Sequence, residues 1–361
     1  MTGPDPLSRR RLGALLAALA LAPLALRAAI AQEGAMTRSG ERPIIIAHRG
    51  ASGERPEHTL EAYALAIAQG ADVIEPDLVI TKDGVLVARH ENEISETTDV
   101  ADRPEFAARR TSRTIDGQPV SGWFTEDFTL AELKTLHARE RLPRLRPASA
   151  SHDGRYRIPT FAEVLALARS RGVGVYPETK HPSYFRALGL PLEEPLLGDL
   201  ARAGWNRADA PVWIQSFEVG NLKALRSRTP VRLVQLIAAQ GGPADGGPAY
   251  GDMLTDAGLA AIAAYAWGIG PQKSLLLAEG EGGRLVDTGL ARRARAAGLG
   301  VHAWTVRAEN LFLPAALRRG ADPAAHGDMA GEVRTLLAAG ATGLFCDFPG
   351  ACVAARDATA G

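Results

Sequence analysis

Short apolar runs alternate with amphipathic stretches from residue 43 onward. Each apolar run has the length and the flanking turn residues of a buried β-strand, whereas each amphipathic stretch has the period of a helix. In one such helix, Thr160 and Glu163 form a predicted capping box and Gly172 is a predicted C-terminal stop. The predicted strands are residues 43–48, 73–80, 173–177, 211–215, 231–236, 264–269, 300–305 and 343–346, and the predicted helices include 60–69, 160–172, 220–227 and 289–297.

Eight strands separated by helices are typical of an α/β fold in which a parallel sheet closes on itself, the (β/α)8 TIM barrel. We therefore predict one barrel over residues 43–355. The block 92–157 is poor in strands and rich in Arg and Pro, which indicates a small inserted subdomain beside the barrel mouth, after a hairpin that carries His90. An open, doubly wound sheet is the alternative fold, but no Gly-x-Gly-x-x-Gly follows the first strand.

The first 31 residues have the pattern of an export signal. Three arginines at positions 9–11 precede the apolar run 12–26, and Ala29-Ile30-Ala31 is a small-x-small cleavage site. The arginine pair favours a twin-arginine signal, with a Sec signal as the alternative. The apolar run is too short to span a bilayer. We expect a mature chain that starts near Gln32, lies in the periplasm or is secreted, and has no stable membrane insertion.

The charge balance of the chain excludes one class of partner. Among the 361 residues, 41 basic and 41 acidic side chains cancel, which argues against nucleic acid as a partner. Residues 1–31 hold four arginines and one aspartate, so their removal would leave 37 basic and 40 acidic residues. Two cysteines, Cys346 and Cys352, are too few for a cysteine-rich zinc site, and both a short-range disulfide and two free thiols are open to them.

Acidic side chains gather at the predicted strand ends. Glu75 and Asp77 are two residues apart on one strand, so both side chains leave the same face. Glu178 and Lys180 repeat this spacing at the end of the next predicted barrel strand. Three carboxylates at one barrel mouth suit a hard divalent cation, Ca²⁺ or Mg²⁺. The alternative is a set of salt-bridged residues without a metal.

A hairpin is predicted to bring a histidine to this cluster. Asp83-Gly84 lies between two β-type runs and has the sequence of a two-residue turn. That register places His90 opposite Asp77, whereas a slip of one residue would turn His90 to the other face. His48 and Arg49 follow the first strand, where the histidine can exchange protons and the arginine can bind a phosphate. Together these side chains indicate phosphate-ester chemistry.

Short motifs occur in a fixed order along the chain: Ile-Ala-His-Arg-Gly-Ala-Ser-Gly at 46–53, Pro-Glu-His-Thr at 56–59, Glu-Pro-Asp at 75–77, Thr-Lys-Asp-Gly at 81–84, Ala-Arg-His at 88–90, Pro-Glu-Thr-Lys at 177–180, Gln-Ser-Phe at 215–217 and Trp-Thr-Val at 304–306. This ordered set resembles the glycerophosphodiester phosphodiesterases, and most closely their exported, periplasmic branch, which carries a similar insertion. The resemblance covers nearly the whole mature chain. Two positions depart from many members, since Glu91 follows His90 where Asp is common and His58 stands where Asn is common.

The resemblance implies a barrel that hydrolyses small glycerophosphodiesters to sn-glycerol 3-phosphate and an alcohol such as choline, ethanolamine or glycerol. It implies a divalent metal, usually Ca²⁺ in exported members and otherwise Mg²⁺. We expect His58 to flank a helix cap outside the site, and Asp347 to be structural. The roles that the resemblance implies are acid/base catalysis for His48 and His90, metal binding for Glu75, Asp77 and Glu178, phosphate binding for Arg49 and Lys180, and contact with the glycerol or lining of the site for Trp304 and Gln215.

Two other functions fit parts of the sequence. A related barrel phospholipase would act on intact lipids, but the block 92–157 has no strong cluster of aromatic or apolar residues for a membrane surface. An exported binding protein could keep the barrel without turnover, but it would be expected to lack at least one of the two histidines or three carboxylates. No feature of the sequence indicates an oligomeric state.

Overall fold

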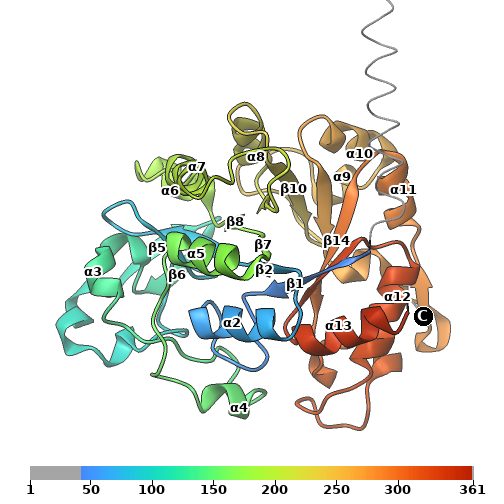
Figure 1. Ribbon diagram of the computed structural model, residues 1–361, viewed down its shortest axis with the longest axis horizontal. Helices are drawn as coiled ribbons and strands as arrows, with labels where there is room; N and C mark the ends of the chain where they lie inside the picture. The colour runs from blue at the N-terminus through green and yellow to red at the C-terminus, as the bar shows by residue number, and fades with distance from the viewer. Residues whose placement is uncertain (1–41, 360–361) are drawn as a thin grey trace, which may run out of the picture. The chain divides into compact units, whose positions relative to one another are not determined.

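Eight barrel positions are filled by parallel strands in the computed structural model, which describes residues 42–359 (Figure 1). The proposed signal, residues 1–31, lies outside the described residues. Two of the eight positions are each occupied by a pair of short strands in line. The strands in order around the barrel are β1 (Ile44–His48), β2 (Val73–Glu75) with β3 (Asp77–Ile80), β7 (Gly174–Val175) with β8 (Glu178–Thr179), β9 (Trp213–Ser216), β10 (Arg232–Ile237), β11 (Gly268–Pro271), β14 (Gly300–Val306) and β15 (Gly343–Cys346).

The strand pairings close the sheet into a barrel. β1 pairs with β2 on one side and with β15 on the other, and every other neighbouring pair around the ring is also parallel. The predicted strand 73–80 is interrupted at Pro76, and the predicted strand 173–177 is interrupted at Pro177, because proline cannot donate to a ladder. The structure therefore has the predicted (β/α)8 fold.

Helices cover the outside of the barrel strands (Figure 1). Thr160 and Glu163 make both bonds of the predicted capping box, and Gly172 ends that helix with a φ of 69°. The prediction of a strand at 264–269 was wrong at its start, because a helix runs to Ala263 and the strand begins only at Gly268. The main helices are α2 (Leu60–Ala68), α5 (Phe161–Arg171), α7 (Glu193–Arg202), α8 (Val219–Arg226), α10 (Asp256–Ala263), α11 (Leu290–Ala296), α12 (Met329–Ala338) and α13 (Pro349–Asp357).

Aromatic side chains fill the inside of the barrel. The rings of Tyr176 and Trp213 stack with centroids 5.7 Å apart, and Phe345 meets Tyr176 edge-on at 5.0 Å. The hydroxyl of Tyr176 lies 2.9 Å from Nδ1 of His302, so these two polar groups are paired, whereas Nε1 of Trp213 is buried without a hydrogen-bond partner in the described chain. Because the interior is packed, space for a substrate is left only at a barrel end.

The segment 92–157 forms a layer of short elements beside the barrel. It contains the antiparallel hairpin β5 (Thr111–Ile115) and β6 (Gln118–Gly122) and the short helices α3 (Leu130–Leu133) and α4 (Pro147–Ala150). Phe106, Phe124 and Phe128 are buried, and the rings of Phe106 and Phe128 meet edge-on and belong to the same hydrophobic core as residues of the barrel. A stretch with no regular element, residues 134–146, leads into α4.

The two cysteines are joined in a disulfide. Cys346 ends β15 and Cys352 lies in α13, with 6.6 Å between their Cα atoms. Of the two alternatives left open by the sequence, the structure therefore has the bonded pair. Among residues 42–359, no helix combines the length and the apolar character that crossing a membrane requires.

Candidate active site

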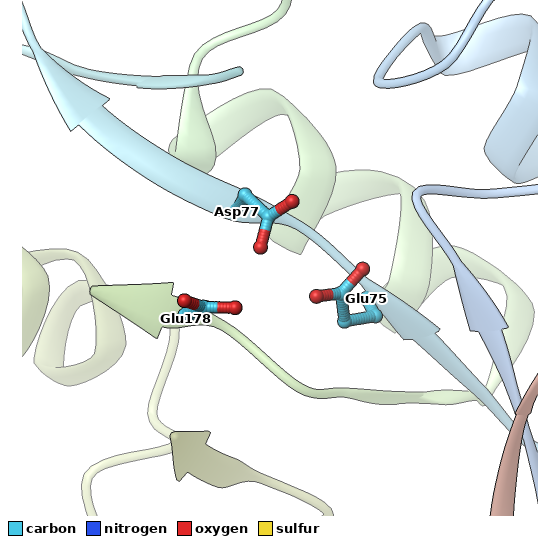
Figure 2. Close-up of side chains that lie close together, drawn as sticks. All are labelled: Glu75, Asp77 and Glu178. Carbon is cyan, nitrogen blue, oxygen red and sulfur yellow. The ribbon is translucent and has the colours of Figure 1, made fainter. Parts of the chain in front are cut away.

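Three carboxylates meet at the carboxyl end of the barrel. Glu75 ends β2, Asp77 begins β3 and Glu178 begins β8, where Asp77 and Glu178 are register partners. One oxygen from each side chain lies within 4.8 Å of the others, and Figure 2 shows all three groups directed at one common space. The structure thus brings together the residues that the sequence proposed as metal ligands.

The electrostatics of this cluster favour a cation. Burial, together with the neighbouring carboxylates Asp77 and Glu178, raises the pKa of Glu75 well above its usual range. Burial likewise raises the pKa of Glu178 to about 8. Burial acts in the same direction on Asp77, but Lys180 and a hydrogen bond from His58 outweigh it and hold the pKa of Asp77 well below its usual range.

The donor set fits a hard divalent ion. Oδ1 of Asp77 is buried and accepts no hydrogen bond within the described chain, and the same is true of Oε1 of Gln215. Carboxylate oxygens without protein donors are the ligands that Ca²⁺ and Mg²⁺ prefer. Glu75, Asp77 and Glu178 could therefore hold such an ion.

Cationic and amide side chains surround the carboxylates. Lys180 places Nζ 2.9 Å from Oε1 of Glu178 and 3.9 Å from Oδ1 of Asp77. Gln215 donates from Nε2 to Oε1 of Glu75 at 2.9 Å. Arg49 places Nε 3.3 Å from Oδ2 of Asp77. The three predicted substrate-binding residues named here therefore lie beside the predicted metal ligands.

A left-handed turn explains the His-Arg-Gly motif. Arg49 has a φ of 61° and Gly50 a φ of 88°, so the chain reverses directly after β1. A Cβ at position 50 would lie 2.7 Å from the carbonyl carbon of Ala62 in α2, which leaves room only for glycine. The backbone N–H of Arg49 donates to Oε2 of Glu75 at 2.8 Å, which ties the turn to the carboxylate cluster.

His48 is held by Asp347, which we had expected to be structural only. Nδ1 of His48 lies 2.7 Å from Oδ1 of Asp347, and Oδ2 of Asp347 accepts from Arg146 at 2.6 Å and from Arg307 at 3.0 Å. Asp347 follows β15, so it reaches the mouth from the strand next to His48. Burial, followed by Arg49, lowers the pKa of His48 to about 4, against the raising effect of Asp347.

The predicted hairpin register was wrong by one residue. The turn is a three-residue loop, in which Thr81 N donates to the Val85 carbonyl and Gly84 has a φ of 80°. Leu78 therefore pairs with Ala88, and Arg89 rather than His90 is opposite Asp77.

His90 still belongs to the site. β4 (Leu86–Ala88) ends before this residue, so the side chain of His90 is not bound to the alternating faces of the strand. Nδ1 of His90 is hydrogen-bonded to Glu91, so the longer carboxylate at this position does reach the histidine. Burial, and then the charges of Arg49 and Lys180, lower the pKa of His90 to about 3. His90 follows Arg89, whose backbone N–H donates to the Asp77 carbonyl at 3.0 Å, which places His90 next to the carboxylate cluster.

His58 was wrongly placed outside the site. Its ring is fully buried, with Nε2 3.0 Å from Oδ2 of Asp77 and Nδ1 2.8 Å from the hydroxyl of Tyr63. His58 therefore orients a proposed metal ligand, although it also precedes the N-cap Thr59 as expected. Its place within the Pro-Glu-His-Thr motif was the one signal in the sequence for this role.

Two cavities adjoin these residues. One of about 210 Å³ lies against Glu178 and Lys180 and is lined further by Phe217, Glu218 and Tyr250. The other, of about 470 Å³, is lined by Trp304 and by residues after β11 and β14. Trp304 donates from Nε1 to the Gly270 carbonyl at 2.7 Å and meets the ring of Phe217 edge-on. Space for a small substrate therefore exists on both sides of Phe217 and Trp304.

A closed (β/α)8 barrel with acidic, cationic and histidine side chains at its carboxyl end is the framework of a phosphodiester-hydrolysing barrel enzyme. Residues 48–351 match the glycerophosphoryl diester phosphodiesterase family, and the chain belongs to this family.

Relatives and solved structures agree with this assignment. The chain is 36% identical to the glycerophosphodiester phosphodiesterase GDPD6 of Arabidopsis thaliana, over 86% of this chain and 84% of that protein. It is 32% identical to the glycerophosphodiester phosphodiesterase of Haemophilus influenzae, over 87% and 90%. The fold resembles that of an Oleispira antarctica phosphodiesterase solved in complex with the product sn-glycerol-3-phosphate, with a TM-score of 0.60, 21% identity and coverage of 87% and 97%. The chain is an enzyme with glycerophosphodiester phosphodiesterase activity.

Proposed function

We propose that this enzyme hydrolyses small glycerophosphodiesters to sn-glycerol 3-phosphate and an alcohol, with a divalent metal at Glu75, Asp77 and Glu178 and with His48 and His90 as acid and base. The observation that carries the proposal is the carboxylate cluster, whose oxygens lie within 4.8 Å of one another. His48 is the register partner of Glu75, and His90 follows Arg89, whose backbone N–H donates to the Asp77 carbonyl. The product bound to the Oleispira antarctica phosphodiesterase supports the substrate class. Ca²⁺ is the proposed ion and Mg²⁺ the alternative.

Different side chains of the site would bind different parts of the substrate. When bound, the metal would supply positive charge to the phosphoryl oxygens as negative charge develops on them. Arg49 and Lys180 add two further cations beside the cluster, and neither is more than 8% exposed. Gln215 holds Glu75 in place. Trp304, with its ring beside Phe217, provides an apolar surface against which the carbon chain of glycerol can pack.

The two histidines are prepared to exchange protons. Both have a lowered pKa and are therefore neutral at pH 7, with Nδ1 occupied by Asp347 or Glu91. Nε2 is then the nitrogen that faces the substrate. The anionic phosphate of the bound substrate raises the pKa of a nearby imidazole, so that one histidine takes up a proton at Nε2 and delivers it to the leaving alcohol, while the other, still neutral, takes the proton of the attacking oxygen at Nε2.

A hydrolysis assay tests this proposal. Protein starting at Gln32 should release glycerol 3-phosphate from glycerophosphocholine in the presence of Ca²⁺, and a chelator should abolish the release. His48→Ala and His90→Ala should each remove most of the activity, whereas His152→Ala, which changes a partly exposed histidine outside the site, should not. Activity that survives both the chelator and the two site substitutions would refute the proposal. Faster turnover of intact phosphatidylcholine than of glycerophosphocholine would instead indicate a phospholipase.

We also propose that residues 1–31 are an export signal and that residues 92–157 are a subdomain inserted into the barrel. The arginines before the short apolar run support the first statement, and the separate hairpin and buried phenylalanines of 92–157 support the second. Sequencing the N-terminus of the protein isolated from its own cells should find Gln32. An N-terminus at Met1 would contradict export by cleavage.

A further inference from the structure

Two arginines of the segment 92–157 reach the mouth of the barrel. Each is hydrogen-bonded to a carboxylate, and each carboxylate is hydrogen-bonded to one of the two proposed catalytic histidines. We propose that Arg141 and Arg146 are positioning residues for catalysis, each fixing one histidine through its carboxylate, so that this segment is a working part of the active site. The inference rests on the proposed roles of His48 and His90.

Arg141 fixes the pair formed by His90 and Glu91. Its NH1 donates to Oε1 of Glu91 at 3.0 Å and its NH2 donates to Oε2 at 2.6 Å, so that both carboxylate oxygens are held. The same guanidinium donates from Nε and NH2 to the two oxygens of Glu57, at 3.0 and 2.7 Å. Glu57 in turn accepts from NH1 of Arg49 at 3.1 Å. Arg141 therefore fixes the supports of one proposed catalytic residue and of one proposed phosphate-binding residue.

Arg146 fixes the pair formed by His48 and Asp347. Its NH2 donates to Oδ2 of Asp347 at 2.6 Å, while Oδ1 of Asp347 faces Nδ1 of His48. Its other two nitrogens have partners as well, because Nε donates to Glu309 at 2.6 Å and NH1 donates to the Ser52 carbonyl at 3.0 Å. The Arg146 side chain is only 6% exposed. A planar guanidinium with this many partners has one orientation, which lysine cannot reproduce.

One short stretch of backbone carries both arginines. Arg146 N donates to the Leu142 carbonyl at 2.8 Å, so that a single turn separates the two side chains before α4 begins. Glu140 anchors the start of this turn, because it is buried and accepts from the backbone N–H of Leu142 and from the hydroxyl of Ser149. The two histidines are thus positioned by one common element.

These contacts matter because a buried carboxylate needs compensating positive charge. Asp347 is 2% exposed, and an ionised carboxylate at such a depth needs charged donors to stay ionised and in one orientation. Without Arg146, Asp347 keeps Arg307 but loses one of its two arginine donors. Without Arg141, Glu91 loses both of its arginine hydrogen bonds, so in each case the imidazole that the carboxylate supports is held less firmly. A displacement of about 1 Å at a reacting group can cost roughly 100-fold in rate.

The test compares three arginines of this one stretch. Arg141→Gln and Arg146→Gln should each lower kcat for glycerophosphocholine by about 10- to 100-fold, although neither arginine is proposed to touch the substrate. Arg146→Gln should leave KM nearly unchanged, whereas Arg141→Gln should also raise KM, because Arg141 supports Arg49 through Glu57. Arg144→Gln is the matched control, because Arg144 lies between the two in sequence and is exposed, and its kcat should equal that of the wild type. Circular dichroism and thermal melts should show all variants folded at the assay temperature.

Rescue distinguishes positioning from general support of the fold. In Arg141→Ala and Arg146→Ala, added guanidinium ion should restore part of kcat, whereas urea at the same concentration should not. Three results would overturn the inference. They are a change in KM without a change in kcat, an equal loss of kcat in Arg144→Gln, and a loss of kcat that parallels the loss of thermal stability and is not rescued by guanidinium ion. If Arg146→Ala does not fold, the partly exposed Arg141 carries the test alone. A wild-type enzyme without chelator-sensitive activity would refute the proposed function itself, whereas active wild type with fully active arginine variants would refute this inference only.

Discussion

Withdrawal of the metal should destabilise the folded enzyme by an amount that the carboxylate cluster determines. Three carboxylate oxygens lie within 4.8 Å of one another, and a pair of unit charges at that distance would repel by about 3.5 kcal/mol at an effective dielectric constant of about 20. This repulsion adds to burial in raising the pKa of Glu75 and of Glu178, so without a cation the cluster takes up protons. Lys180 offsets one of the three charges through its contact with Glu178 at 2.9 Å. A divalent ion would compensate the other two, so binding should be coupled strongly to folding.

The expected size follows from mass action. An ion present at about 100 times its Kd adds about 2.7 kcal/mol to the free energy of unfolding when only the folded state binds it. For a domain of this size, 1 kcal/mol shifts Tm by roughly 2 °C, so saturation should raise Tm by about 5 °C. A larger rise in Tm is expected when the ion concentration exceeds its Kd by more than about 100-fold.

Differential scanning fluorimetry can measure this shift. Protein stripped with a chelator should melt several degrees lower than protein with excess Ca²⁺, and titrations with Ca²⁺ and Mg²⁺ would rank the two ions. Glu178→Gln should reduce the ion-dependent rise, because it removes one of the three charges. Glu96→Gln, at an exposed position, is the control and should keep the full rise. Equal melting with and without both ions, or an undiminished rise in Glu178→Gln, would refute the assignment of these carboxylates to a metal.

Three further predictions concern other parts of the structure. Asp347→Asn should lower kcat by about 10- to 100-fold, because a hydrogen bond to a charged group contributes about 1.5–3 kcal/mol to holding His48; unchanged steady-state kinetics would contradict this. Burial raises the pKa of Glu140 to about 7, above its unfolded value, so the wild type should lose stability as the pH rises from 4.5 to 7. Glu140→Gln should remove this loss, which urea unfolding of both proteins at pH 4 and pH 8 can measure. A difference in the free energy of unfolding between wild type and variant that does not change with pH would argue against the raised pKa. Reduction of the disulfide between Cys346 and Cys352 should lower the free energy of unfolding by about 2 kcal/mol, and identical urea curves for oxidised and reduced protein would count against its contribution.

The convergence of Glu75, Asp77 and Glu178 could be predicted because a closed parallel barrel leaves little freedom. Once the strands are assigned, their carboxyl ends must meet at one mouth, and side chains two residues apart must share a face. The interruptions at Pro76 and Pro177 did not disturb this result, since the chain continues in the same direction after each proline.

Details that depend on loop geometry could not be predicted in the same way. The register of the hairpin depends on whether Asp83-Gly84 is the whole of a two-residue loop or part of a three-residue loop, and both loops have the same sequence signature. His90 reached the site only because the chain leaves the strand after Ala88.

The supporting residues were missed for a further reason, which is that they act through contacts between segments far apart in sequence. Asp347 is 299 positions from His48, and no periodicity links them. The stretch that holds Arg141 and Arg146 has no apolar pattern, so composition alone identified it as arginine-rich. His58 was assigned to a helix cap because its neighbour Thr59 is a good N-cap residue, and only its buried contact with Asp77 reveals a second role.

The ion pair between Arg146 and Asp347 has a consequence for how such an enzyme can evolve. A positive charge that belongs to the segment 92–157 balances a buried negative charge that directly follows the last barrel strand. Shortening the segment past position 146 would leave that negative charge with one fewer partner, even if the barrel itself still folded. A lineage could therefore lose the segment only after another cation had taken this place, or together with a change at position 347.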